Sequence, residues 1–81
     1  MRAKLILNLR HPQSDLDELL FKRFVEPGDT VLDAGANIGF TTSQLLSAGA
    51  TRVIALEPVP ELFERLCRLN TDKVVAQNKA L

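Results

Sequence analysis

Two acidic side chains and a glycine loop are the residues of this chain whose types and spacing could bind a ligand. Asp33 lies near the end of an apolar run and is followed closely by Gly35, where the absence of a Cβ lets the backbone turn sharply and approach a ligand. Gly39 begins a helical pattern, where it would let that helix pack close to the sheet. Glu57 ends a second apolar run, 24 residues after Asp33. This spacing is typical of a nucleoside site at the ends of two parallel strands.

Two phosphate-binding alternatives fit the glycine loop poorly. A P-loop requires a lysine directly after its last glycine, but the chain has no lysine between Arg23 and Lys73. The dinucleotide fingerprint would place glycines at positions 35, 37 and 40, whereas this chain has Asn37 and Phe40 at the second and third of them. A pyrophosphate ligand is therefore disfavoured.

A nucleoside ligand without phosphate fits the residues better. The Asp33 carboxylate would repel pyrophosphate but could hold an ammonium group, directly or through water. Glu57 could accept hydrogen bonds from two ribose hydroxyls. A ligand carboxylate could lie near the amides of Gly39 and Phe40, because the start of a helix favours an anion. Ammonium, carboxylate and ribose together describe S-adenosylmethionine, which we expect as the cofactor.

The elements that would position these residues alternate between strand and helix. Runs without polar alternation predict strands buried on both faces, and amphipathic stretches between them predict helices. The predicted strands are Thr30–Ala34, Arg52–Glu57 and Lys73–Gln77, and the predicted helices begin at Ser14, Ile38 and Pro60. We therefore expect half of a doubly wound α/β fold with a parallel sheet in the order third, second, first strand and helices on both faces. The outer edge of Thr30–Ala34 would then be unpaired and available for self-association.

The amino-terminal residues and the composition give weaker predictions. Leu5–Leu9 is an apolar run interrupted by Asn8, which predicts a strand or an apolar flap in a segment 1–13 that precedes a domain at 14–81. Ten Lys and Arg balance ten Asp and Glu, so the chain has no electrostatic footprint for nucleic acid or an anionic membrane. The single cysteine, Cys67, has no internal disulfide partner and is expected at the core or its boundary. No metal site is expected, and a cytoplasmic location fits best.

Three motifs resemble the FkbM family of class I S-adenosylmethionine-dependent methyltransferases. The segment from Pro27 to Phe40, with its Gly-Ala-Asn-Ile-Gly core, is similar to the first motif of that family. Leu56-Glu57-Pro58 resembles the second motif, and Asn78-Lys79-Ala80-Leu81 resembles the segment that closes the third. Asn37 replaces a glycine that is common in class I enzymes at large, although asparagine also tolerates the left-handed conformation.

The resemblance implies a Rossmann-like fold and a set of cofactor contacts, to which later strands and loops of such enzymes would add the rest of the adenine pocket. Residues implied on the methionine side of the cofactor are Asp33, Gly35, Ala36, Asn37 and Gly39; Glu57 would hold the ribose and Pro58 would form a wall near the adenine. The implied activity is methyl transfer, here expected as O-methylation of a small molecule or glycan. No catalytic residue is expected, because the later strands that receive the acceptor are absent, and the fragment alone should be inactive. The alternative is a non-catalytic nucleotide-binding or structural half-domain that acts through a partner.

Overall fold

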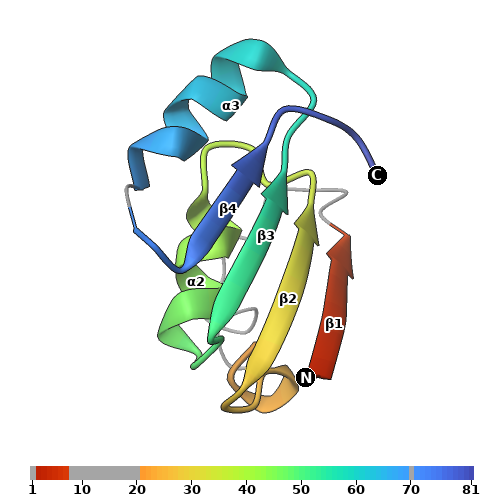
Figure 1. Cartoon of the computed structure of the whole chain (residues 1–81), viewed down its shortest axis with the longest axis vertical. Helices are drawn as coiled ribbons and strands as arrows, with labels where there is room; N and C mark the ends of the chain where they lie inside the picture. The colour runs from red at the N-terminus through yellow and green to blue at the C-terminus, as the bar shows by residue number, and fades with distance from the viewer. Residues whose placement is uncertain (1, 8–20, 70) are drawn as a thin grey trace.

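Four strands form one parallel sheet in the computed structural model, which describes residues 2–7, 21–69 and 71–81 (Figure 1). The strands are β1 (Arg2–Leu7), β2 (Asp29–Ala34), β3 (Arg52–Leu56) and β4 (Val74–Gln77). They lie in the order β1-β2-β3-β4, with every neighbouring pair parallel. The predicted α/β class is confirmed, and the three strands expected from the sequence are neighbours as β2, β3 and β4.

The helices between the strands have local signals at their ends. Helix α2 (Phe40–Ser47) ends where Gly49, at a φ of 111°, donates its N–H to the Leu46 carbonyl, and Ala50 donates to Leu45. This is a Schellman motif, for which glycine is the preferred residue. Helix α3 (Pro60–Leu66) begins with proline in its first turn and continues into a 3-10 turn, η1 (Cys67–Leu69). Residues 21–24 are helical, and the predicted helix start at Ser14 lies outside the described residues.

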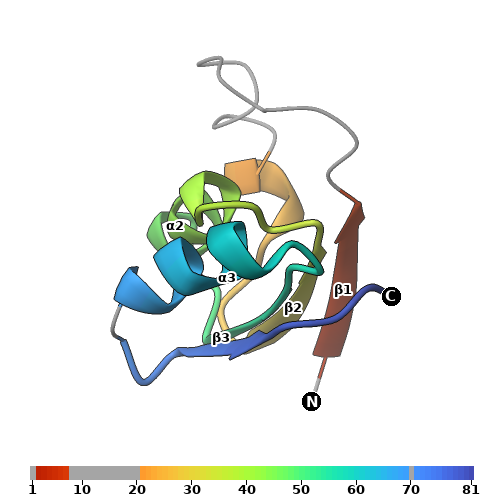
Figure 2. The same ribbon diagram turned by 90° about the horizontal axis from the view of Figure 1, so that it is seen from above.

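All the helices in the described part of the chain lie on one face of the sheet, which corrects the expectation of helices on both faces (Figure 2). The strand order follows the order of the chain, so each crossover moves across the sheet in the same direction. Right-handed crossovers that move in one direction place their helices on the same face. Coverage of the second face would require the direction of winding to reverse.

The edge of β2 is paired with β1, which corrects the expectation of an unpaired edge at Thr30–Ala34. The pairing runs from Arg2 opposite Asp29 to Leu7 opposite Ala34. The sequence prediction began the amino-terminal run at Leu5 and gave it no partner, whereas the strand begins three residues earlier. Self-association through this edge of β2 would have to displace β1.

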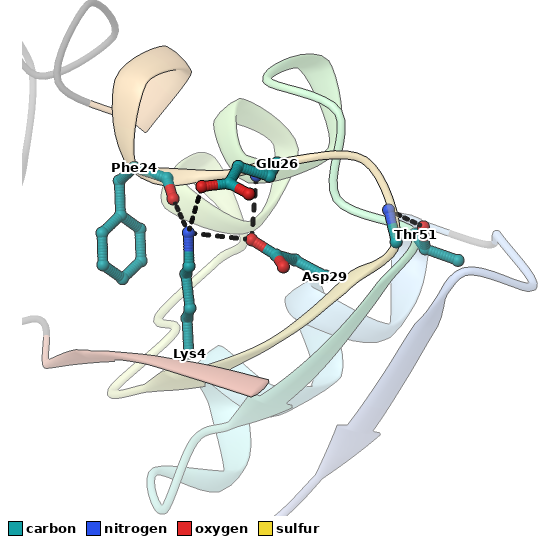
Figure 3. A network of polar contacts seen from close by, with 6 residues as sticks. Lys4, Phe24, Glu26, Asp29 and Thr51 are labelled. Atoms are coloured by element: carbon teal, nitrogen blue, oxygen red, sulfur yellow. Dashed lines mark hydrogen bonds and ion pairs between the residues drawn. The ribbon is translucent and has the colours of Figure 1, made fainter. Parts of the chain in front are cut away.

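A network of polar contacts holds β1 against its neighbours at the amino-terminal end of the sheet (Figure 3). The Lys4 ammonium lies 3.0 Å from Oδ2 of the buried Asp29, donates to the Phe24 carbonyl and lies 4.9 Å from the centre of the Phe24 ring. Oδ2 of Asp29 also accepts the backbone N–H of Glu26 at 2.8 Å. The network therefore joins β1 to the helical turn at 21–24 and to the start of β2.

The hydrophobic core fills the space between the sheet and the helices. Its fully buried members are Val31, Leu45, Val53, Ala55 and Leu66. On the other face of the sheet, four apolar side chains form a row across the paired strands, namely Leu5, Leu32, Ile54 and Val75. The two outer members of this row are exposed, Leu5 by 47% and Val75 by 38%. Cys67 is exposed in η1, which corrects its expected place at the core or its boundary.

Candidate functional site

The glycine loop turns sharply at the carboxyl end of β2. Gly35 and Asn37 have φ angles of 77° and 58°, so both adopt the left-handed conformation that the sequence predicted for this loop. The N–H groups of Gly35 and Ala36 both donate to the Leu56 carbonyl at 2.9 Å. The loop is therefore held against the last residue of the neighbouring strand β3.

Glu57 connects this loop to the turn that follows β3. It is 4% exposed, its Oε1 accepts the Asn37 N–H at 2.7 Å, and its Oε2 accepts the Val59 N–H at 2.9 Å. A carboxylate offers about four acceptor positions, so these two bonds leave capacity for ribose hydroxyls. Sequence reasoning selected Glu57 as a ligand residue and missed its two backbone bonds. The bond to Asn37 joins segments 20 residues apart and leaves no local signal, whereas the bond to Val59 is local to the turn.

Asp33 lies below the loop, between the sheet and helix α2. It is fully buried, and its Oδ2 accepts a hydrogen bond of 2.6 Å from the Thr42 hydroxyl. This bond fixes the first turns of α2 on the end of β2. Thr42 is itself fully buried, in the first turn of α2. Contact between Asp33 and a ligand ammonium stays a prediction.

Gly39 allows a close approach between the start of α2 and the end of α3. A Cβ at this position would lie 2.7 Å from Cδ1 of Leu69 and 3.2 Å from Cδ1 of Leu66. The sequence predicted close packing at Gly39 but assigned it to the sheet. The close neighbours are instead α3 and η1, so Gly39 sets the spacing within the helix layer.

Asn78 belongs to the site although it was not among its predicted residues. Its Nδ2 donates to the carbonyls of Glu57 at 2.8 Å and Pro58 at 3.1 Å. Its place in the segment that resembles the third motif was the only sequence signal for it.

Pro58 is exposed, and the next side chain, Val59, is 43% exposed. Together they present an apolar ledge beside Glu57.

The structure thus divides the predicted residues into two groups. Gly35, Ala36, Asn37, Glu57 and Pro58 meet at the carboxyl ends of β2 and β3, where ligands bind in open α/β sheets. Asp33 and Gly39 lie outside this group. Asp33 is bonded to α2 through Thr42, and Gly39 packs against α3 and η1. In the ranges 2–7, 21–69 and 71–81, no group of three or more His, Cys, Asp or Glu side chains could hold a metal ion. Over the same ranges, no helix is long and apolar enough to cross a membrane.

Comparison with known proteins gives one curated relative. The chain is 42% identical over 60 residues to a tRNA U34 carboxymethyltransferase of Shewanella frigidimarina. The match covers 72% of this chain but only 17% of the relative. No family model and no solved structure matches the chain, so membership of the FkbM family is not confirmed. The relative carries the name of a group-transfer enzyme, and the chain spans a small part of its length.

Proposed function

We propose that this chain is the cofactor-binding region of an S-adenosylmethionine-dependent methyltransferase. The observation that carries the proposal is the 2.7 Å hydrogen bond from the Asn37 N–H to Glu57 Oε1. This bond joins the loop after β2, in which Gly35 and Asn37 have positive φ angles, to the acidic side chain that directly follows β3. Similarity to a relative named as a carboxymethyltransferase supports a transferase of this general kind.

The residues present fit the groups of this cofactor. Gly35 has no Cβ that would obstruct a ligand beside the loop, and Glu57 retains acceptor capacity for ribose hydroxyls. Pro58 and Val59 offer apolar contact for the adenine. When bound, S-adenosylmethionine supplies a methyl carbon on a positively charged sulfur, which is a good leaving group. The role of this chain is to hold that carbon in line with an acceptor, which is the main source of rate in such a reaction.

The proposed acceptor is a hydroxyl oxygen of a small molecule or glycan. The name of the relative gives a tRNA as its substrate. For this chain, the equal numbers of basic and acidic residues favour an acceptor other than nucleic acid, because tRNA-binding surfaces are strongly basic. No described residue is proposed as a general base. Stronger binding of the whole protein to tRNA than to small acceptors would overturn the proposed acceptor class.

Calorimetric titration of the full chain with S-adenosylmethionine, and separately with NAD, tests the cofactor. We expect S-adenosylmethionine to bind and NAD to bind much more weakly, because the loop lacks the glycines of a pyrophosphate site. Binding of neither ligand by a chain that is folded by circular dichroism would favour the alternative, a structural half-domain that acts through a partner. Preferential binding of NAD would overturn the choice of cofactor.

Substitution of Glu57 tests its assignment to the ribose. Loss of a charge-assisted hydrogen bond costs about 1.5–3 kcal/mol, so Glu57→Ala should weaken binding of S-adenosylmethionine by about 10- to 100-fold. Glu57→Gln keeps the shape of the side chain and serves as a second variant if the alanine variant unfolds. Glu61→Ala, on the exposed first turn of α3, is the matched control and should bind like the wild type. Unchanged affinity in folded Glu57 variants would contradict the assignment.

A further inference from the structure

The side chain of Asn78 holds the backbone of Glu57 and Pro58, just beyond the paired part of β3 and β4. The last backbone bond between these two segments is donated by the Glu57 N–H to the Gln77 carbonyl at 3.0 Å. After it, the Asn78 amide donates to two successive carbonyls, those of Glu57 and Pro58. The asparagine therefore extends the connection between the two strands to the turn at 57–59.

This turn also carries the groups that would face a nucleoside. The side chain of Glu57 and the N–H of Val59 are joined by a 2.9 Å hydrogen bond within the turn. The carbonyls of the same turn are the acceptors for Asn78. The peptide groups on both sides of Pro58 are thus fixed by two sets of bonds, one from within the turn and one from the segment after β4.

We propose that Asn78 is a positioning residue that sets the orientation of the Glu57–Val59 turn, and through it the Glu57 carboxylate and the Pro58–Val59 ledge. The effect on ligand binding rests on the proposed function. Asn78 acts through backbone carbonyls and is not itself required to touch the ligand. Its position couples the loop after β4 to the loops after β2 and β3, because Glu57 in turn accepts the Asn37 N–H.

The chemistry of the contact requires an amide. Two carbonyl oxygens are acceptors only, and the Asn78 NH₂ group supplies two N–H donors on one nitrogen. An aspartate of nearly the same shape has no donor when ionised and would bring a negative charge to the two oxygens. An alanine removes the donor without adding charge. Comparison of the two variants therefore separates loss of the bonds from repulsion.

Amide hydrogen exchange, followed by NMR on the ligand-free chain, tests the positioning of the turn. We expect Asn78→Ala to speed exchange of the Val59 N–H by about 10-fold and Asn78→Asp by more, because local opening then breaks fewer bonds. The Val53 N–H, which is bonded to the Lys73 carbonyl within the buried sheet, reports opening of the whole sheet and should not change. Lys79→Ala, next to Asn78 and exposed, is the matched control. Equal acceleration at Val59 and Val53, or no acceleration at Val59, would overturn the positioning role.

Calorimetric titration of the same variants with S-adenosylmethionine tests the consequence for the ligand. We expect an affinity about 10-fold below that of the wild type in both Asn78 variants, with the Lys79→Ala chain unchanged. Faster exchange at Val59 combined with wild-type affinity would show that the turn does not orient the ligand. Absence of binding by the wild type would refute the proposed function, and with it the ligand role of Asn78, while the exchange result still decides whether Asn78 positions the turn.

Discussion

Gly39 and Gly49 flank the same helix with similar backbone conformations and different surroundings. Their φ angles are 98° and 111°, but a Cβ would meet Leu69 and Leu66 only at Gly39, whereas nothing lies within 4 Å at Gly49. Both glycine-to-alanine variants incur the cost of a left-handed residue, about 1–2 kcal/mol. Gly39→Ala should lose about 1 kcal/mol more, because the Leu69 and Leu66 side chains must shift to admit the methyl group. Urea denaturation of both variants measures the difference, and equal losses would show that Leu69 yields freely.

The site residues show how far sequence reasoning reaches at the scale of single side chains. The left-handed conformations of Gly35 and Asn37 could be predicted because local backbone geometry restricts residue type directly. The bonds of Glu57 to Asn37 and of Asn78 to Pro58 could not, since they depend on how separate loops approach one another. The burial of Asp33 could not be predicted for the same reason, because it depends on how helix α2, which carries Thr42, packs on β2.

At the scale of elements, an ion pair between Lys4 and Asp29 adds to the backbone pairing that holds β1 on β2. Lys4 lies 3.0 Å from Asp29, which is fully buried, while the Lys4 side chain is 24% exposed. Removing one partner of a buried pair leaves an uncompensated charge, so Lys4→Met should cost roughly 3 kcal/mol, at the low end of the range for buried pairs because of that exposure. Urea denaturation measures the loss, with Lys73→Met, an exposed lysine before β4, as the control.

A double variant guards this test against simple unfolding of the chain. Lys4→Met combined with Asp29→Asn removes both charges and should recover part of the stability lost in Lys4→Met. A Lys4→Met chain as stable as the Lys73→Met control would show that β1 is held by its backbone pairing alone.

The strands and helices themselves were largely predictable, and their partners were not. The stretches at Thr30–Ala34, Arg52–Glu57 and Lys73–Gln77 have the apolar, β-branched composition of buried strands, and each corresponds to a strand. Arg2–Leu7 mixes basic and apolar residues, so its composition gave no sign that it pairs along the whole of β2. Periodicity identifies an element, whereas its neighbour is set by the topology of the whole chain.

At the scale of the molecule, the helices among the described residues cover one face of the sheet and none of them lies on the other. The row formed by Leu5, Leu32, Ile54 and Val75 lies on the face without described helices. Parallel sheets normally have both faces covered, so this row should bind an apolar fluorescent dye in the isolated chain. The double variant Leu32→Thr/Ile54→Thr replaces two apolar side chains of the row with threonine, which is more polar and is well tolerated in strands. We expect it to reduce dye fluorescence by about twofold or more.

The control for the dye experiment lies outside this row. Val59→Thr changes an apolar side chain that is 43% exposed at the N-cap of α3 and should leave dye binding nearly unchanged. Circular dichroism confirms that each variant is folded. Equal fluorescence from the double variant and the wild type would place the dye elsewhere on the molecule.

The strand order β1-β2-β3-β4 has a consequence for how the chain can assemble during synthesis on the ribosome. Each strand pairs with the one made just before it, and the paired residues are 21 or more positions apart in the chain, as Val53 and Val74 are. No strand has to be inserted between two that are already paired, so the sheet can grow at a single edge as the chain emerges. The loop after β2 is then synthesised before Glu57. The hydrogen bond from the Asn37 N–H to the Glu57 carboxylate can form only after β3 has been made.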